Sequence, residues 1–306
     1  MSQRIYSLAY LSSHRCTPAQ AIGVAAQTGY HFVGLRLWPN AAGAPQQQLL
    51  GQPEVLRETL AAQRDTGVGV FDLEIIRIGE QFDPHTWDAL FDAGAALKAK
   101  AILVAGDDPD EARLTDHYAR LCEVMKPFGM SADLEFMPWT AVKDAKSALR
   151  IVQGAGMPAN AGILVDALHF GRSTTTLDDI RAIPRELLHY AQIGDAQAGL
   201  NFSTEQMIHT ARCERLLPGE GNIDLQGLFA ALPADLPVSV EVVNLSREAN
   251  TSAQEWAAKC MGATLRTTQS LETSQVTRGA KVALSNGAPK NNCDAGTFNA
   301  NKADRT

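Results

Sequence analysis

Cysteine is scarce in this sequence, and its spacing contains no paired motif. The five cysteines include no C-x-x-C pair and lie at positions 16, 122, 213, 260 and 293. A disulfide framework or a zinc ribbon needs paired cysteines, so neither is expected, and a reducing cytoplasm fits this usage best. No stretch approaches the roughly 18 apolar residues of a membrane span, and the N-terminus lacks the apolar core of a secretion signal. We therefore expect neither membrane insertion nor secretion.

Basic residues are fewer than acidic ones: the sequence has 27 Lys and Arg and 34 Asp and Glu, which gives a formal net charge of −7. Polyanions repel an acidic chain, so no nucleic-acid partner is expected. Phosphate-binding signatures are also missing: no G-x-G-x-x-G follows the first predicted strand, and no G-x-x-x-x-G-K-[ST] occurs. In contrast, apolar content is ample, and 306 residues that are 45% hydrophobic and 20% charged can bury the core of one large α/β domain.

Short apolar stretches alternate with helical stretches along most of the chain. The first helical stretch shows typical boundary signals, with Thr17 and Pro18 before it and Gly29 after it. Continuous apolar runs such as ILVA are typical of strands buried on both faces of a parallel sheet. The predicted strands are 4–11, 32–38, 68–76, 99–105, 131–137, 161–167, 188–194 and 237–243. The predicted helices are 17–29, 53–66, 84–98, 108–127, 140–154, 176–188, 224–232 and 252–266.

This alternation predicts an α/β fold, a closed (β/α)₈ TIM barrel over residues 1–266. An open doubly wound sheet is the alternative, but its usual nucleotide-binding fingerprint is missing. Residues 267–306 differ from the rest, since they are rich in Ser, Thr, Asn, Gly and Ala and contain one aromatic residue, Phe298. Because no helical or strand period occurs there, we predict a disordered polar C-terminal tail.

Four polar residues lie near the carboxyl ends of four successive predicted strands, where TIM barrels place their active sites. They are Glu135, Asp166, Gln192 and Glu241, each within an otherwise apolar strand. Burying three carboxylates in one barrel mouth is costly without compensation. One divalent cation would compensate them, and this hard oxygen set suits Mn²⁺ or Mg²⁺ better than Zn²⁺. The alternative is that each carboxylate pairs with a buried arginine or caps a helix.

The order and spacing of these four residues resemble those of a known superfamily. The positions are separated by 31, 26 and 49 residues, and the chain adds Asp166-x-x-His169, Gln192-x-x-Asp195 and a PGEG segment at 218–221. On these motifs, residues 1–265 resemble the sugar phosphate isomerase/epimerase superfamily of xylose isomerase-like TIM barrels. Its members include ketose 3-epimerases, hydroxypyruvate isomerase, inosose dehydratase and 3-dehydroshikimate dehydratases.

The resemblance implies one divalent cation, with Mn²⁺ or Mg²⁺ expected first and Co²⁺ or Zn²⁺ as alternatives. It implies two catalytic glutamates that exchange protons with the substrate from opposite sides and also bind the metal. It further implies that His169 is catalytic and contacts a substrate oxygen, and that Arg215, assisted by Arg212, binds the substrate. The implied metal ligands are Glu135, Asp166, Gln192 and Glu241.

The expected function is therefore a metal-dependent isomerase or epimerase of a small sugar or hydroxy-keto acid. A carboxylate would remove a proton next to a carbonyl, and the cation would stabilise the enediolate. Loss of a β-hydroxyl from that intermediate would instead make the protein a dehydratase. Two departures matter for this choice. Most sugar epimerases carry His at the position of Gln192, whereas the 3-dehydroshikimate dehydratases resemble this chain there. Arg36 stands where many members have Glu.

Several other residues have two interpretations. Arg36 would bind an anionic substrate group or neutralise Glu74. Glu74 and Arg77 could line the pocket or pair with each other. His14 could reach the substrate or lie on a surface loop. Asp195 is expected to orient a ligand or the substrate, or else to cap the segment that follows it.

Two other functional classes are weaker. A related barrel, the endonuclease that repairs abasic DNA, uses a His-rich cluster of three zinc ions, whereas this chain has seven His in total and a negative charge. A non-catalytic metabolite-binding barrel would bind metal without turnover. The expected partner is a small polyhydroxy or keto-acid substrate, with no membrane partner, and a homo-oligomer is compatible with the sequence.

Overall fold

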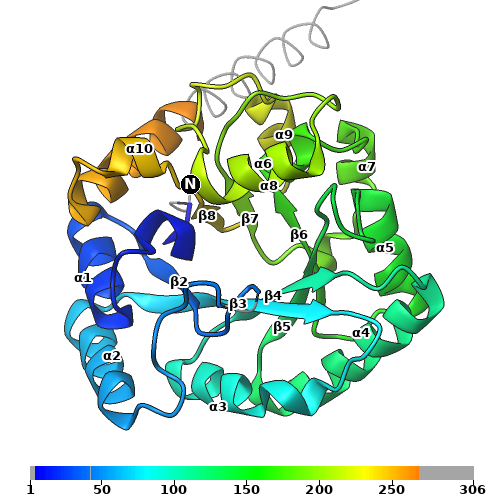
Figure 1. Cartoon of the computed structure of the whole chain (residues 1–306), viewed down its shortest axis with the longest axis horizontal. Coiled ribbons are helices and arrows are strands. Elements are labelled where there is room, and N and C mark those ends of the chain that lie inside the picture. The colour runs from blue at the N-terminus through cyan, green and yellow to red at the C-terminus, as the bar shows by residue number, and fades with distance from the viewer. Residues whose placement is uncertain (1–3, 42, 269–306) are drawn as a thin grey trace, which may run out of the picture.

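Eight parallel strands pair in chain order, and β1 pairs with β8 to close the barrel (Figure 1). The computed structural model describes residues 4–41 and 43–268. The predicted TIM barrel is confirmed, and each predicted strand overlaps an observed one. The strands are β1 (Tyr6–Leu8), β2 (Phe32–Arg36), β3 (Gly69–Ile78), β4 (Ala101–Gly106), β5 (Ser131–Glu135), β6 (Ala161–Asp166), β7 (Ala191–Ile193) and β8 (Val238–Val240).

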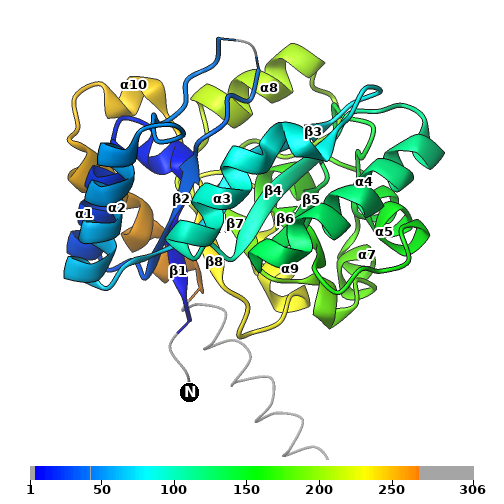
Figure 2. The same cartoon turned by 90° about the horizontal axis from the view of Figure 1, so that it is seen from below.

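Helices surround the barrel, and the carboxyl ends of the strands open on one side of it, beside α8 and α10 (Figures 1 and 2). The α-helices are α1 (Pro18–Thr28), α2 (Pro53–Thr66), α3 (Asp88–Leu97), α4 (Glu111–Met125), α5 (Ala145–Gly154), α6 (Ala167–Gly171), α7 (Leu177–Arg181), α8 (Thr204–Cys213), α9 (Leu225–Ala231) and α10 (Leu245–Glu248). Four 3₁₀ turns join them: η1 (Tyr10–Ser13), η2 (Pro84–Trp87), η3 (Lys126–Phe128) and η4 (Arg185–Leu187).

Some element boundaries differ from the prediction for local reasons. The first strand ends early because Ser12 turns back to β8, where its hydroxyl donates to the Val240 carbonyl at 2.7 Å and accepts the Val242 N–H. The predicted helix 176–188 is broken into α7 and η4 at Pro184, which has no N–H to donate. Three short helices were not predicted, namely α6, α8 and α10.

Apolar side chains form two main layers. The larger one lies between the strands and the surrounding helices, and it includes the buried Trp256, Tyr118 and Phe91. The smaller one fills the barrel interior and is made of Phe71, Ile75, Ala101, Leu103, Ala105, Met137, Leu164 and Tyr190. The barrel is therefore packed, as is usual for this fold, and leaves a ligand access only at its mouth.

A partly buried ion pair joins β5 to the segment before β7. Asp133 of β5 is fully buried, and one of its carboxylate oxygens lies 2.8 Å from Nδ1 of His189. The hydroxyl of Ser131 donates to its other oxygen. Gly162 of β6 makes room for this pair, because a side chain there would collide with both Asp133 and His189.

The last described segment is a helix over residues 253–268. It includes two residues of the predicted tail, and the hydroxyl of Thr268 lies 3.0 Å from that of Tyr6 at the start of β1. This helix therefore continues two residues past the predicted boundary at residue 266. The rest of the predicted disordered tail, 269–306, lies outside the described residues. Within the described chain, no helix combines the length and the hydropathy needed to cross a membrane.

Candidate active site

The predicted ligand residues lie at matching depth in the barrel mouth. Glu135 and Asp166 are the last residues of β5 and β6, Gln192 is paired with Asp166 in register, and Glu241 directly follows β8. All four are buried, each 4% exposed or less. The sequence prediction that these side chains converge at the carboxyl ends of the strands agrees with their positions.

Glu135, Asp166 and His169 form a compact group that could hold a metal ion, with one donor atom of each within 4.8 Å of the others. His169 Nε2 lies 3.6 Å from Glu135 and 3.7 Å from Asp166. Asp166 also starts α6, because its Oδ1 accepts the Leu168 N–H at 2.7 Å. This cap places His169 one helical turn later. The ring of Trp139 packs edge-on against the His169 ring, and the two ring centroids are 4.9 Å apart.

Arg215 enters the same group and joins two of its carboxylates. Its Nη1 lies 2.8 Å from Asp166 and its Nη2 lies 2.5 Å from Glu241, and the side chain is 2% exposed. The Ala211 carbonyl accepts from Nε and holds the guanidinium in place. Arg215 was predicted to bind the substrate. It lines the mouth pocket, and in this structure its contacts are made to the carboxylates.

Burial and mutual repulsion control protonation here. Burial, then the charges of Asp166 and Glu241, raise the pKa of Glu135 well above its usual value. Burial also raises the pKa of Glu241, against the pull of Arg215. Burial opposes ionisation of Asp166 too, but Arg215 and His169 hold the pKa of that carboxyl below its usual value. Burial lowers the pKa of His169 to about 4, so its imidazole is neutral at pH 7.

The residues fit a divalent cation. With Glu135, Asp166 and Glu241 all ionised, as ligands of a cation are, Arg215 offsets only one of the three charges and two negative charges remain without a cationic partner. The Gln192 amide donates to Glu241 at 3.2 Å, and its buried Oε1 has no hydrogen-bond partner among the described residues. A divalent cation matches both the two missing charges and this free oxygen.

Arg36 lines the mouth pocket, and the sequence interpretation that it binds an anionic substrate group stays a prediction. Its Nε and Nη2 donate to one oxygen of Glu74 at 3.1 and 2.6 Å, and its guanidinium lies over the Tyr10 ring, 4.4 Å from the centroid. The other interpretation, that Arg36 neutralises Glu74, is confirmed. Glu74 and Arg77 do not pair with each other, because Arg77 forms two hydrogen bonds with Asp107, both 2.6 Å long.

Asp195 lies outside the lining of the mouth pocket, and its expected role in orienting a ligand or the substrate stays a prediction. Its carboxylate accepts N–H groups of Ala196 and of the PGEG segment and its flank, including Gly219 at 2.9 Å and Gly221 at 3.0 Å. Asp195 therefore shapes that segment, as the second sequence interpretation proposed.

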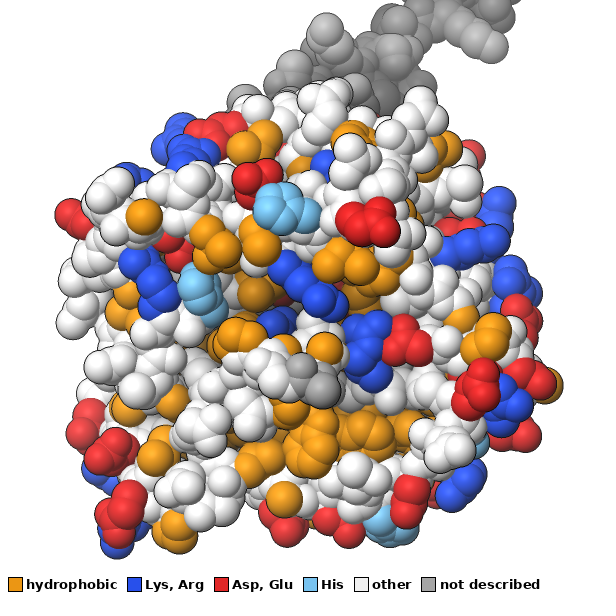
Figure 3. All heavy atoms as spheres, in the orientation of Figure 1, with side chains coloured by type: hydrophobic (Ala, Val, Ile, Leu, Met, Phe, Trp, Pro, Cys, Tyr) orange, Lys and Arg blue, Asp and Glu red, His pale blue; other side chains and the backbone are white. Residues whose placement is uncertain are grey.

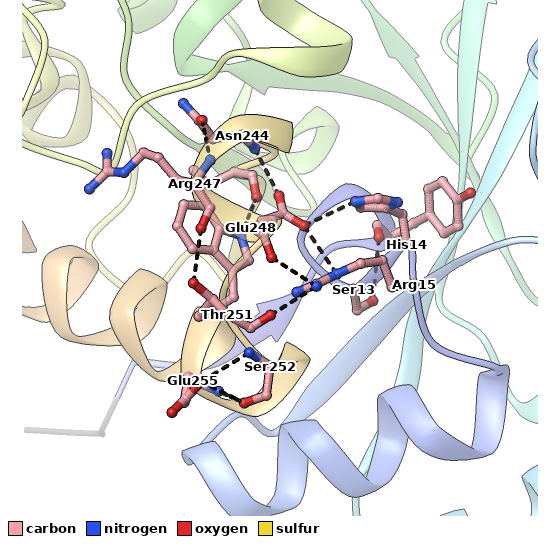
Figure 4. Close-up of polar contacts among 12 residues, drawn as sticks. Ser13, His14, Arg15, Asn244, Arg247, Glu248, Thr251, Ser252 and Glu255 are labelled. Atoms are coloured by element: carbon pink, nitrogen blue, oxygen red, sulfur yellow. Dashed lines mark hydrogen bonds and ion pairs between the residues drawn. The ribbon is translucent and has the colours of Figure 1, made fainter.

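His14 belongs to a contact between the start of the chain and α10 rather than to the pocket lining (Figure 4). Its Nε2 lies 3.0 Å from the buried carboxylate of Glu248. Arg15 lies 3.5 Å from the same carboxylate and donates to the carbonyls of Glu248 and Thr251. The carboxylate also accepts the Asn244 N–H at 2.8 Å.

A pocket of about 410 Å³, its solvent-open part included, leads from this group to the surface. Apolar side chains, among them Ile75, Met137 and Trp139, form part of its wall. Its polar lining includes four residues of the candidate metal site, namely Glu135, Glu241, His169 and Arg215. It also includes Arg36, Glu74, Asn40, Arg77 and Arg212. Arg212 is thus in the pocket, as predicted. Figure 3 shows this face of the molecule, with Lys and Arg side chains gathered near its centre.

Some residues of the mouth were not predicted. Asn40 and Asp107 both contact Arg77, and Asn40 accepts from it at 3.0 Å. Asp107 directly follows β4, so an acidic residue at a strand end was a signal available in the sequence. Asn40 lies in the loop after β2, and no pattern in that loop indicates which residue turns toward the pocket.

Comparisons with known proteins agree on the architecture. The structure resembles the IolI protein with a bound zinc atom (17% identity, 87% of this chain, 99% of that chain, TM-score 0.69). It resembles the probable 3-DHS dehydratase AsbF from Bacillus anthracis (15%, 85% and 98%, TM-score 0.67). It also resembles a D-allulose 3-epimerase from Methylomonas sp. in complex with D-allulose (17%, 85% and 96%, TM-score 0.61). At these identities the likeness concerns the fold.

A search of curated proteins gives no match. A family model described as xylose isomerase-like TIM barrel matches residues 22–263, which is most of the chain and nearly all of the described barrel. The superfamily resemblance drawn from the sequence is confirmed. The protein belongs to the xylose isomerase-like TIM barrel family.

Proposed function

We propose that this protein is a divalent-metal-dependent isomerase or epimerase of a small sugar or hydroxy-keto acid. The observation that carries this proposal is the buried group of Glu135, Asp166 and His169, extended by Glu241 and Gln192, with two negative charges left without a cationic partner. The family includes epimerase and dehydratase structures, and one structural neighbour binds zinc, which supports this class of chemistry.

Glu135, Asp166, Gln192 and Glu241 would hold the cation. When bound, the cation supplies positive charge next to the substrate oxygens and so stabilises the charge that develops on proton removal. Neutral His169 donates or accepts a hydrogen bond at a substrate oxygen without adding charge. Trp139 covers one side of His169 and limits the access of water to it.

The two glutamates have the position and chemistry for proton transfer. One of the carboxylates of Glu135 and Glu241 takes the proton from the carbon next to the carbonyl, and the other returns a proton from its own side. Arg215 contacts Glu241 directly and keeps that carboxylate oriented. Proton transfer between carbons gives an isomerase, and return to the opposite face of one carbon gives an epimerase.

A dehydratase is the second candidate, and Gln192 is the observation that favours it. An amide on β7 replaces the histidine found in most sugar epimerases and adds no titratable group next to Glu241. In this alternative, the same proton removal is followed by departure of a β-hydroxyl as water, so a carbon–carbon double bond forms. A zinc-cluster nuclease is less supported, because the described residues contain a single group suited to a metal.

The first test measures metal binding and turnover together. Wild-type protein titrated calorimetrically with Mn²⁺ should bind one ion, and a chelated sample should lose its activity. Turnover is followed by NMR on ketoses and hydroxypyruvate, and by ultraviolet absorbance on 3-dehydroshikimate. Proton exchange with solvent without loss of water supports the isomerase. Metal-dependent growth of absorbance supports the dehydratase instead.

Glu135→Gln and Glu241→Gln should abolish turnover, with a loss of at least about 10³-fold, because each removes a proton-transfer group as well as a metal ligand. Circular dichroism should show an intact fold, since each substitution removes a buried charge and keeps the shape. Glu123→Gln, an exposed change on α4, is the matched control and should keep full activity. Near-normal turnover in either site variant would contradict the assigned roles.

A further inference from the structure

Four arginines line the mouth pocket, and carboxylates neutralise three of them. Asp166 and Glu241 are the partners of Arg215. Glu74 neutralises Arg36, and Asp107 neutralises Arg77. Arg212 also lines the pocket, and no hydrogen bond or ion pair connects its side chain to a described residue. The outer pocket therefore has a guanidinium with free donors next to two arginines whose charges are already balanced.

Arg212 is positioned for the pocket by the secondary structure. It lies in the last turn of α8, the helix beside the carboxyl ends of the strands (Figure 2). Ala211, the residue before it, also lines the pocket, and Arg215 follows one turn later. The positive charges of Arg77 and Arg36 lower the pKa of Arg212, after burial, which places the three cationic groups close to one another.

The net charge around Arg212 differs from the net charge of the candidate metal site. Glu135, Asp166 and Glu241 carry two more negative charges than Arg215 offsets, and a divalent cation would bring that group to neutrality. The positive charge of Arg212, an exposed residue, would then remain in the lining of the same cavity. Guanidinium donors left free in a pocket are suited to carboxylate or phosphate oxygens.

We propose that Arg212 is the anchor of an anion subsite and that the substrate carries a carboxylate or phosphate group at the end remote from the reacting carbon. The inference rests on the proposed function for the position of the reacting carbon only. Arg77 and Asn40 form the neighbouring wall, and their mutual hydrogen bond keeps the Arg77 guanidinium in place. Arg212 is thus a specificity-determining residue, not one that transfers protons.

Binding measurements test this inference without requiring turnover. The Mn²⁺-loaded protein is titrated with dihydroxyacetone, dihydroxyacetone phosphate and hydroxypyruvate, which present a neutral, a phosphate and a carboxylate group. Inorganic phosphate is a fourth probe. At low salt, at least one anionic compound should bind at least about tenfold more tightly than dihydroxyacetone. A charge-assisted hydrogen bond adds enough binding free energy for a gain in affinity of this size. The compound that gains identifies phosphate or carboxylate as the ligand.

Arg212→Gln should remove that gain, and Arg212→Lys should restore part of it as a point charge. Arg64→Gln is the matched control, since Arg64 is also a basic residue in the last turn of a helix but lies near the amino end of β3. Equal affinity for neutral and anionic probes, or an unchanged gain in Arg212→Gln, would overturn the anion subsite. Turnover of a neutral sugar at least as efficient as that of every anionic candidate would also overturn it, while the isomerase proposal would stand. Anion binding that depends on Arg212, without turnover of any candidate, would instead contradict the proposed function alone.

Discussion

At the scale of single residues, the pair of Asp133 and His189 gives the clearest dependence on pH. Burial lowers the pKa of His189, but the hydrogen bond and charge of Asp133 outweigh it and raise the pKa above its usual value. A histidine whose pKa is higher in the folded state stabilises the fold below its unfolded pKa. This contribution is lost as the pH rises through the folded pKa.

We therefore expect His189→Gln to lower the free energy of unfolding by about 1–2 kcal/mol near pH 6 and by less near pH 9. Urea unfolding at both pH values measures the difference. His85→Gln is the control, because His85 forms an exposed pair with Asp88 that should contribute little. A difference in the free energy of unfolding between wild type and His189→Gln that grows with pH would contradict this account.

Residue positions were predictable where a polar residue interrupts an apolar strand. That pattern identified Glu135, Asp166, Gln192 and Glu241, and the family resemblance added His169. The partners of Arg77 and Arg215 were not predictable, because several carboxylates lie within reach of a long arginine side chain. Arg77 pairs with Asp107, whereas Glu74 pairs with Arg36.

At the scale of elements, α10 and η1 are joined through one buried carboxylate (Figure 4). Glu248→Ala would leave His14 and Arg15 without their carboxylate partner and free the Asn244 N–H. We expect a loss of about 2–4 kcal/mol in the free energy of unfolding, because partners of a buried charge are left unpaired. Chemical denaturation measures this. Glu123→Ala on the exposed face of α4 should cost at most about 0.5 kcal/mol, and equal losses in both variants would refute the interpretation.

Element types were predictable to different degrees. Strands and long helices followed from apolar runs and boundary residues, and α2 begins and ends at its predicted residues. The sequence contained a signal for α8, because Ser203 and Gln206 form a capping box at its start. The short helices α6 and α10 span five and four residues, which is too little sequence for a helical period to be seen.

At the scale of the whole molecule, every strand, the β1–β8 closure and the contact of Thr268 with Tyr6 lie within the described residues. A chain ending at Thr268 should therefore keep the melting temperature and the metal affinity of the full chain. A chain ending at Ala263 should melt lower, since it loses the end of the last helix and the partner of Tyr6. Calorimetry of the three proteins measures both effects. A lower melting temperature after removal of 269–306 alone would contradict the prediction.

The pairing of β1 with β8 has a consequence for protein synthesis. Tyr6 and its partner Val238 are separated by more than 200 residues, so the first strand leaves the ribosome long before its second neighbour exists. At about 5–20 residues per second, this delay is on the order of 10 to 50 seconds. During that time the nascent chain exposes the open edge of β1, which can pair with other chains. Chaperone dependence during translation should accordingly exceed that of refolding from the complete chain.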